Sequence, residues 1–119
     1  MTTEERRIGL SDLHREMLRE ILAPFADRIE RVSLFGSRAT GRARANSDID
    51  LVLYGDIDDA LMDRIWSLCD ESALPVRVDL CAYDRIIEPA LEAHIDAVAS
   101  PLFERHDLLR SASSMPVPR

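Results

Sequence analysis

The chain has 119 residues, 46% of them hydrophobic and 31% charged, a composition that suits one compact domain with a modest core. Its formal net charge of −7 argues against a broad basic surface for duplex nucleic acid. The sequence shows no apolar run long enough for a signal peptide or a membrane span. Its two cysteines lack metal-ligand spacing, which predicts reduced thiols in a cytoplasmic protein.

Ser11 is the predicted N-cap of a first helix, which the apolar spacing extends to about Asp27. A strand follows over residues 31–35 and ends at Gly36. Glycine allows a sharp turn there and brings backbone N–H groups close to an anionic ligand. Ser37 adds a hydroxyl donor and Arg38 a fixed positive fork, and both suit a polyphosphate.

Three arginines, Arg38, Arg42 and Arg44, fall between this turn and the next strand. They predict a small positive lip where a nucleoside triphosphate would enter. A solvated surface loop explains the same residues equally well, and both interpretations stay open.

The second strand, over residues 48–54, carries two carboxylates one residue apart. Asp48 and Asp50 alternate with an apolar series, so both carboxylates share one face of the strand. Their repulsion destabilises folding unless a cation lies between them. Hard oxygen ligands favour Mg²⁺ or Mn²⁺, and two such ions would stabilise the attacking and leaving oxygens of a nucleotidyl transfer. Such a pair of ions requires a third carboxylate.

Asp79 is the candidate for this third carboxylate. A helix is predicted over 58–71, and a strand opened by Pro75 follows, in which polar positions including Asp79 alternate with apolar ones. Neighbouring strands lie about 4.7–4.9 Å apart, so Asp79 could reach metal ions held by the first pair. It could also accept a proton from an attacking hydroxyl.

The rest of the chain completes an α/β (α+β) fold, a small mixed sheet with three helices packed on one face and the carboxylate side open. A third helix is predicted over 84–98, and Leu102 and Phe103 form a short strand or a docked turn. Residues 110–119 predict a disordered tail, which leaves one domain over 1–109.

Three motifs together carry a resemblance. Gly36-Ser37, the run from Ser47 to Leu51 (S-D-I-D-L) and the strand residue Asp79 resemble the nucleotidyltransferase superfamily of DNA polymerase beta. More closely, the chain is similar to minimal nucleotidyltransferases, small proteins often paired with a HEPN-type toxin. The resemblance implies the polymerase beta-like fold over most of the chain.

The resemblance also implies the roles of the site residues. Gly36 and Ser37 would hold the nucleotide phosphates, with Arg38 as a further phosphate contact. Two metal ions, Mg²⁺ or alternatively Mn²⁺, would be bound by Asp48 and Asp50, and Asp79 would bind one of them and help to activate the acceptor.

The family implies a reaction in which AMP passes from ATP to a tyrosine hydroxyl of a HEPN-type toxin. The chain would then be an antitoxin in a hetero-oligomer. After Val98 too few residues remain to build an acceptor domain, so the sequence predicts that a partner supplies the acceptor.

Two alternatives remain. The chain could be a non-catalytic antitoxin that covers its partner by contact alone, although binding alone would not require three mutually repelling carboxylates. It could also transfer a nucleotide to a small hydroxylated molecule, and the missing acceptor domain argues against that reaction.

Overall fold

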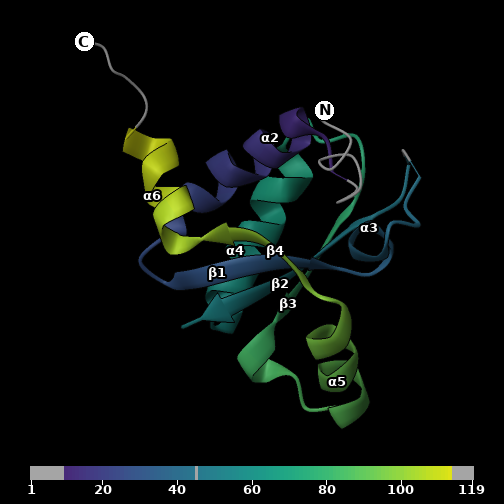
Figure 1. The fold of residues 1–119 in the computed structure, drawn as a ribbon. Helices are drawn as coiled ribbons and strands as arrows, with labels where there is room; N and C mark the ends of the chain where they lie inside the picture. Colours follow the sequence, from purple (N-terminus) through teal and green to yellow (C-terminus); the bar gives the residue numbers. More distant parts are fainter. Residues whose placement is uncertain (1–9, 45, 114–119) are drawn as a thin grey trace.

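A four-stranded mixed sheet in the order β3-β2-β1-β4 organises the molecule (Figure 1). The structure is a computed structural model that describes residues 10–44 and 46–113, with side chains up to Leu109. Strand β1 pairs antiparallel with β2 and β4, whereas β2 and β3 are parallel. The strands are β1 (Ile29–Phe35), β2 (Ile49–Gly55), β3 (Val78–Ala82) and β4 (Ser100–Glu104).

Five α-helices and two short 3₁₀ helices connect these strands within the described residues. They are α2 (Asp12–Leu22), η1 (Ala23–Phe25), α3 (Ser37–Thr40), α4 (Asp59–Glu71), η2 (Tyr83–Arg85), α5 (Pro89–Val98) and α6 (Arg105–Ser113). The predicted cap of the first helix is confirmed, because the Ser11 hydroxyl accepts a hydrogen bond from the His14 N–H at 3.1 Å. Asp58 caps α4 in the same way, accepting from the Leu61 N–H at 2.9 Å.

The first helix is shorter than predicted. It ends at Leu22 rather than near Asp27, and the chain continues as the 3₁₀ helix η1. Pro24 explains the change, because proline has no N–H for the next helical hydrogen bond and its ring clashes with the carbonyl four residues earlier.

The third predicted helix begins later than expected. Tyr83–Arg85 form the 3₁₀ helix η2, and α5 starts only at Pro89. Proline is favoured in the first helical turn, and it biases the preceding residue toward an extended backbone. Glu88 has that conformation, with φ −89° and ψ 116°.

The end of the described chain contains a helix that the sequence did not predict. Leu102 and Phe103 lie in β4, so the short strand is correct, and α6 follows from Arg105 to Ser113. The Asp107 carboxylate accepts from the Glu104 N–H at 2.8 Å, which caps the start of α6. Residues 110–113 of the predicted tail are therefore helical, while 114–119 lie outside the described residues.

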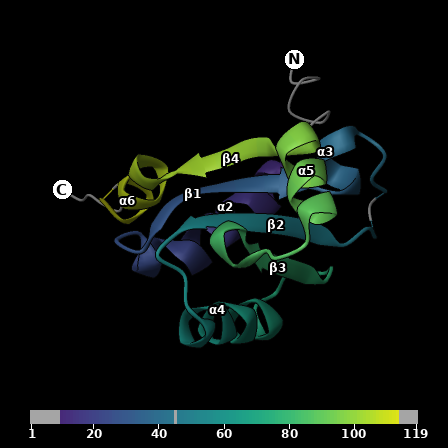
Figure 2. The same cartoon turned by 90° about the horizontal axis from the view of Figure 1, so that it is seen from below.

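The two faces of the sheet carry different elements. Apolar residues of all four strands form the core, together with α2 and α4 on the same side. Helix α5 does not join them, contrary to the predicted packing of three helices on one face. Figure 2 shows α5 on one side of the sheet and α2 on the other. Ile95 of α5 is fully buried against this second face, where Val52 and Ser33 are also buried.

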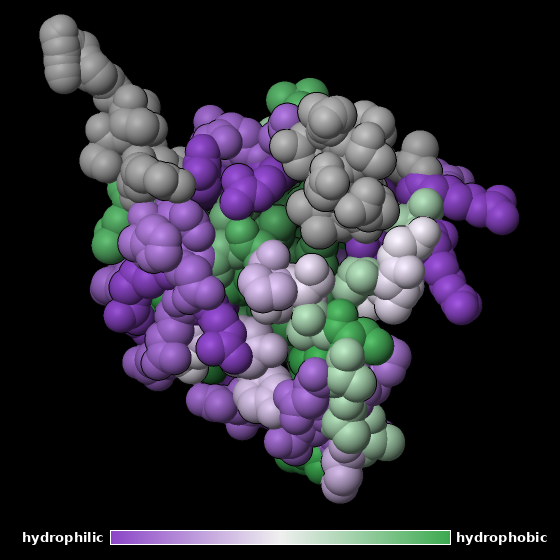
Figure 3. Space-filling view, viewed as in Figure 1, coloured by the Kyte–Doolittle hydropathy of each residue, from purple (hydrophilic) through white to green (hydrophobic). Residues whose placement is uncertain are grey.

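The surface combines a polar side with a weakly polar one. In the view of Figure 3, hydrophilic residues dominate near α6, whereas apolar and weakly polar residues gather over α5. Within residues 10–44 and 46–113, no helix has the length and apolarity that crossing a membrane requires.

Candidate active site

The turn after β1 brings the backbone directly against an aspartate of β2. Gly36 has φ 76° and ψ −153°, a conformation that essentially only glycine adopts. A Cβ added there would overlap Asp50 Oδ2 and lie 3.1 Å from Asp50 Cγ. Gly36 therefore needs to be a glycine because of its positive φ and because its backbone lies against the Asp50 carboxylate. The predicted approach of this turn to a phosphate stays a prediction.

Ser37 follows as the first residue of α3, and it is half-buried. The carbonyl of Gly36 accepts from the Ala39 and Thr40 N–H groups at 3.1 and 3.2 Å, so the short helix folds back on the turn. Ser37 therefore lies at the start of a helical turn beside Gly36, where a phosphate-holding residue was predicted.

The strand register brings two of the predicted aspartates together. Asp50 in β2 and Asp79 in β3 are direct Cα partners across the parallel pair. Asp48 is exposed and directly precedes β2, one residue outside the strand that was predicted to begin with it. The expectation that Asp79 lies on the strand next to the carboxylate pair is confirmed.

The three carboxylates interact through their charges. Burial raises the pKa of Asp50 above its ordinary value, Asp79 and Asp48 raise it further, and the nearby Arg38 partly opposes them. Without a further cation, negative charge at Asp50 is therefore unfavourable, which is the situation that the sequence predicted.

Arg38 has a different environment from the one predicted for a phosphate contact. Its side chain is only 5% exposed, and its guanidinium donates to the carbonyl oxygens of Ser47 at 2.6 Å, Asp48 at 3.2 Å and Arg44 at 3.4 Å. Burial lowers the pKa of Arg38, and Asp50 and Asp48 oppose that effect. These contacts favour a role in holding the loop before β2 rather than the nucleotide.

Of the three arginines of the predicted lip, two remain at the surface. Arg42 and Arg44 are exposed, whereas Arg38 points into the protein. The exposed positions of Arg42 and Arg44 agree with a surface loop, and the positive lip for a nucleoside triphosphate stays a prediction.

A site residue that the sequence interpretation did not select is Arg77. Its Nη2 lies 3.5 Å from Asp79 Oδ1, and the side chain is 68% exposed. The alternating pattern around β3 could have indicated it, because Arg77 is two residues from Asp79 and residues two apart on a strand share a face.

The donor set fits a hard divalent cation. Among the described residues, no three His, Cys, Asp or Glu side chains are already arranged to enclose a metal ion. Mg²⁺ usually takes only one or two carboxylates and completes its shell with phosphate and water, so an open arrangement suits it. Asp48, Asp50 and Asp79 are the residues that would hold Mg²⁺ or Mn²⁺ here.

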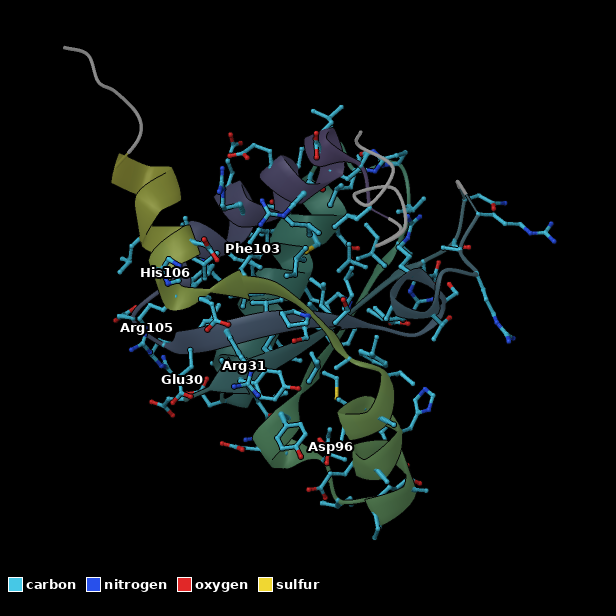
Figure 4. The ribbon with its side chains drawn as sticks, viewed as in Figure 1. Glu30, Arg31, Asp96, Phe103, Arg105 and His106 are labelled. Carbon is cyan, nitrogen blue, oxygen red and sulfur yellow. The ribbon has the colours of Figure 1, made fainter. Side chains whose placement is uncertain are left out.

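An aromatic cluster occupies the opposite end of the same sheet face. The Arg31 guanidinium lies 4.1 Å from the centroid of the Tyr54 ring, and Tyr54 stacks on Tyr83 with centroids 4.9 Å apart. The Tyr83 hydroxyl donates to Asp96 Oδ1 of α5 at 2.8 Å. Figure 4 labels Arg31 and Asp96, the two ends of this cluster. This cluster ties α5 to the same face of the sheet that carries the carboxylates.

A mixed sheet with a glycine turn against one aspartate and a second aspartate on the parallel neighbour defines the nucleotidyltransferase class. The family model described as "Polymerase beta, Nucleotidyltransferase" matches residues 16–108. The chain therefore belongs to the polymerase beta nucleotidyltransferase family.

A curated relative and several solved structures are similar to the chain. "Putative protein adenylyltransferase MJ0604" of Methanocaldococcus jannaschii is 33% identical over 60 residues, which cover 50% of this chain and 57% of that protein. The chain thus aligns with little more than half of that relative's length.

The solved structures support the fold. "Crystal structure of the toxin-antitoxin with AMP-PNP" matches with a TM-score of 0.61 and 22% identity over 85% of each chain. "Crystal structure the toxin-antitoxin MntA-HepT" matches with a TM-score of 0.59 and 18% identity over 87% of this chain and 86% of the other. At these identities the likeness establishes a shared architecture.

Proposed function

We propose that this chain is a metal-dependent nucleotidyltransferase that transfers AMP from ATP to a tyrosine hydroxyl of a HEPN-type toxin and thereby acts as its antitoxin. The observation that carries the proposal is the register of Asp50 and Asp79 beside the Gly36 turn. This geometry places the Gly36 turn, where the phosphates would bind, directly against one of the carboxylates that would hold the metal ions.

The residues would divide the chemistry as follows. Gly36 and Ser37 would hold the phosphates of ATP. Asp48, Asp50 and Asp79 would hold two Mg²⁺ ions, whose charge would offset that of the reacting phosphate and the departing pyrophosphate. Asp79 accepts the proton of the acceptor hydroxyl. The hydroxyl oxygen then bonds to the α-phosphorus, and the bond from that phosphorus to pyrophosphate breaks.

Arg38 supports this chemistry indirectly. Its hydrogen bonds to three carbonyls of the loop before β2 hold Asp48 beside Asp50, and its charge lowers the repulsion between them. We therefore assign Arg38 to positioning the metal ligands and leave the phosphates to Gly36 and Ser37.

Two kinds of observation support a protein as the acceptor. One is the description of the relative as a putative protein adenylyltransferase, together with the toxin-antitoxin complexes among the similar structures. The other is the surface beside β3, where a groove of about 650 Å³ is lined by Trp66, Leu80 and Leu91 among others. Ile87, which also lines this groove, is 91% exposed, so its apolar side chain is accessible to an acceptor protein.

The test is co-expression with a candidate HEPN-type partner, followed by intact-mass measurement of that partner. Wild type should add the mass of AMP and relieve toxicity, whereas Asp50→Asn should do neither at equal expression. Asp70→Asn is the matched control, because it removes an exposed carboxylate of α4 and should behave as wild type. Relief of toxicity by Asp50→Asn would instead establish a non-catalytic antitoxin.

A further inference from the structure

Arg77 lies in the same row of side chains as the predicted metal ligands. It directly precedes β3, and its carbonyl accepts from the Ile49 N–H at 2.8 Å, which fixes its backbone against the start of β2. Ile49 and Val78 are Cα partners, so the register continued by one residue places Asp48 opposite Arg77. On the other side of Ile49, Asp50 lies opposite Asp79. The four side chains therefore form two facing pairs, three anions and one cation.

The two arginines beside the carboxylates differ in their freedom to move. Arg38 is buried, and carbonyl oxygens of the loop before β2 hold its guanidinium. Arg77 is 68% exposed, and its described ion pair is with Asp79 at 3.5 Å. Arg38 is thus a fixed part of the structure, whereas Arg77 can leave its partner at little cost, since exposed ion pairs contribute about 0.2–1 kcal/mol.

We infer that Arg77 is the exchangeable counter-ion of the metal site. It pairs with Asp79 while the site lacks a metal ion, keeps that carboxylate turned toward the site, and yields it when Mg²⁺ or Mn²⁺ binds. The inference rests on the proposed function in one respect, that the three aspartates bind metal. Arg77 is then a positioning residue that acts through Asp79.

This exchange couples the binding of the metal ion to the binding of the nucleotide. A metal ion that arrives alone must break the pair between Arg77 and Asp79, so Arg77 lowers the affinity for free metal. A metal ion that arrives with a triphosphate brings phosphate oxygens to which the released guanidinium can donate, and this contact offsets the lost pair. Arg77 thereby favours the metal–nucleotide complex over the metal alone.

The first measurement is Mn²⁺ binding to the purified chain, followed by electron paramagnetic resonance with and without a non-transferable ATP analogue. Arg77→Gln should bind free Mn²⁺ about two- to fivefold more tightly than wild type, the range that a surface ion pair allows. The gain should disappear when the analogue is present. Arg77→Lys, which keeps the charge, should stay close to wild type.

The matched control is Arg64→Gln, which removes one exposed positive charge from α4. Equal Mn²⁺ affinities for Arg77→Gln and Arg64→Gln would overturn the inference, because the effect would then be one of net charge. If Mn²⁺ binds wild type and not Asp50→Asn, yet Arg77→Gln changes nothing, only the role of Arg77 is wrong. If Mn²⁺ does not bind wild type with or without the analogue, the metal site of the proposed function fails as well.

A double-mutant cycle in EDTA tests the pair without metal. Arg77→Gln should lower the melting temperature in the wild-type background and leave it unchanged in the Asp79→Asn background, since the partner carboxylate is then absent. An equal loss in both backgrounds would show that Arg77 acts elsewhere, and the inference would be wrong.

Discussion

The Asp50 side chain lies where a Cβ of residue 36 would be. A glycine at this position therefore matters for stability as well as for the geometry of the site. Gly36→Ala should destabilise the protein by about 1–3 kcal/mol through its backbone conformation alone. The added Cβ would also displace the Asp50 carboxylate, so the metal-dependent stabilisation by ATP should be lost. Chemical denaturation with and without Mg²⁺ and ATP measures both effects.

Gly41 provides the control for this substitution. It also has a positive φ of 80°, but a Cβ there would meet no atom within 4 Å. Gly41→Ala should therefore cost about 1–2 kcal/mol and leave stabilisation by Mg²⁺ and ATP intact. Equal losses of nucleotide response in both variants would contradict the role of the contact with Asp50.

Asp50 should also give the protein a specific dependence on pH. Its pKa is raised in the folded state, so the folded protein binds this proton more readily than the unfolded chain does. The corresponding stability is present below the unfolded pKa and is lost as the pH rises through the folded pKa. In EDTA, wild type should therefore lose stability relative to Asp50→Asn as the pH increases over this range.

Thermal unfolding of both proteins from about pH 4 to pH 7 tests this expectation, because the ordinary pKa of an aspartate is about 3.9. The difference between the two proteins removes the contributions of their other carboxylates. A difference that stays constant over this range would mean that the environment of Asp50 does not disfavour its charge.

At this scale the sequence predicted that Asp79 lies on the strand beside the carboxylate pair, and the register of β2 and β3 confirms that placement. The spacing of Asp48 and Asp50, the glycine before them and the alternation around Asp79 are local patterns with a direct physical meaning. The environment of Arg38 could not be predicted from such patterns. It depends on hydrogen bonds to three backbone carbonyls of the folded loop, and a sequence does not show which carbonyls a side chain will meet.

Among the elements, α5 differs most from its prediction. The sequence showed an apolar stripe that needs a sheet, but both faces of this sheet have apolar positions. Val52, between Asp50 and Tyr54, is buried on the carboxylate face, and Ile95 is buried there too. Which face α5 covers depends on tertiary contacts such as the hydrogen bond from Tyr83 to Asp96. Local periodicity does not reveal such contacts.

Ile95 should therefore anchor α5 to the sheet. Ile95→Ala removes a fully buried side chain and should destabilise the protein by about 2–5 kcal/mol. Ile87→Ala, at a side chain that is 91% exposed, should change stability by less than about 0.5 kcal/mol. Urea unfolding of the two variants compares them directly, and similar values would show that α5 is not held by Ile95.

Helix α6 was missed for a related reason. Its residues from Arg110 onward are poor in large apolar side chains, which is typical of a disordered tail. The helix depends instead on the cap by Asp107 and on Leu108, which is fully buried. The cap and the buried leucine are single residues. They stabilise a helix here only because β4 places this part of the chain next to the core.

For the molecule as a whole, ligand binding should appear as a gain in stability. Saturating Mg²⁺ and ATP should raise the melting temperature, with a gain of about 2.7 kcal/mol at one hundred times the dissociation constant. With EDTA in place of Mg²⁺ the gain should be much smaller, since the phosphates would meet three uncompensated carboxylates. Equal stabilisation in both conditions would count against a metal-bridged site.

The parallel pairing of β2 and β3 also determines when the site can exist during folding. Strands β1 and β2 are close in sequence and antiparallel, whereas β3 can join them only after α4 has crossed the sheet. Strands that are distant in sequence pair late in folding, because the connecting segment loses conformational entropy before the stabilising contacts between the strands form. On the ribosome, a chain that ends before Val78 already contains Asp48 and Asp50 but has no neighbouring strand to carry the third carboxylate. If the third carboxylate is needed as proposed, nucleotide binding would begin only after β3 has been synthesised and has joined the sheet.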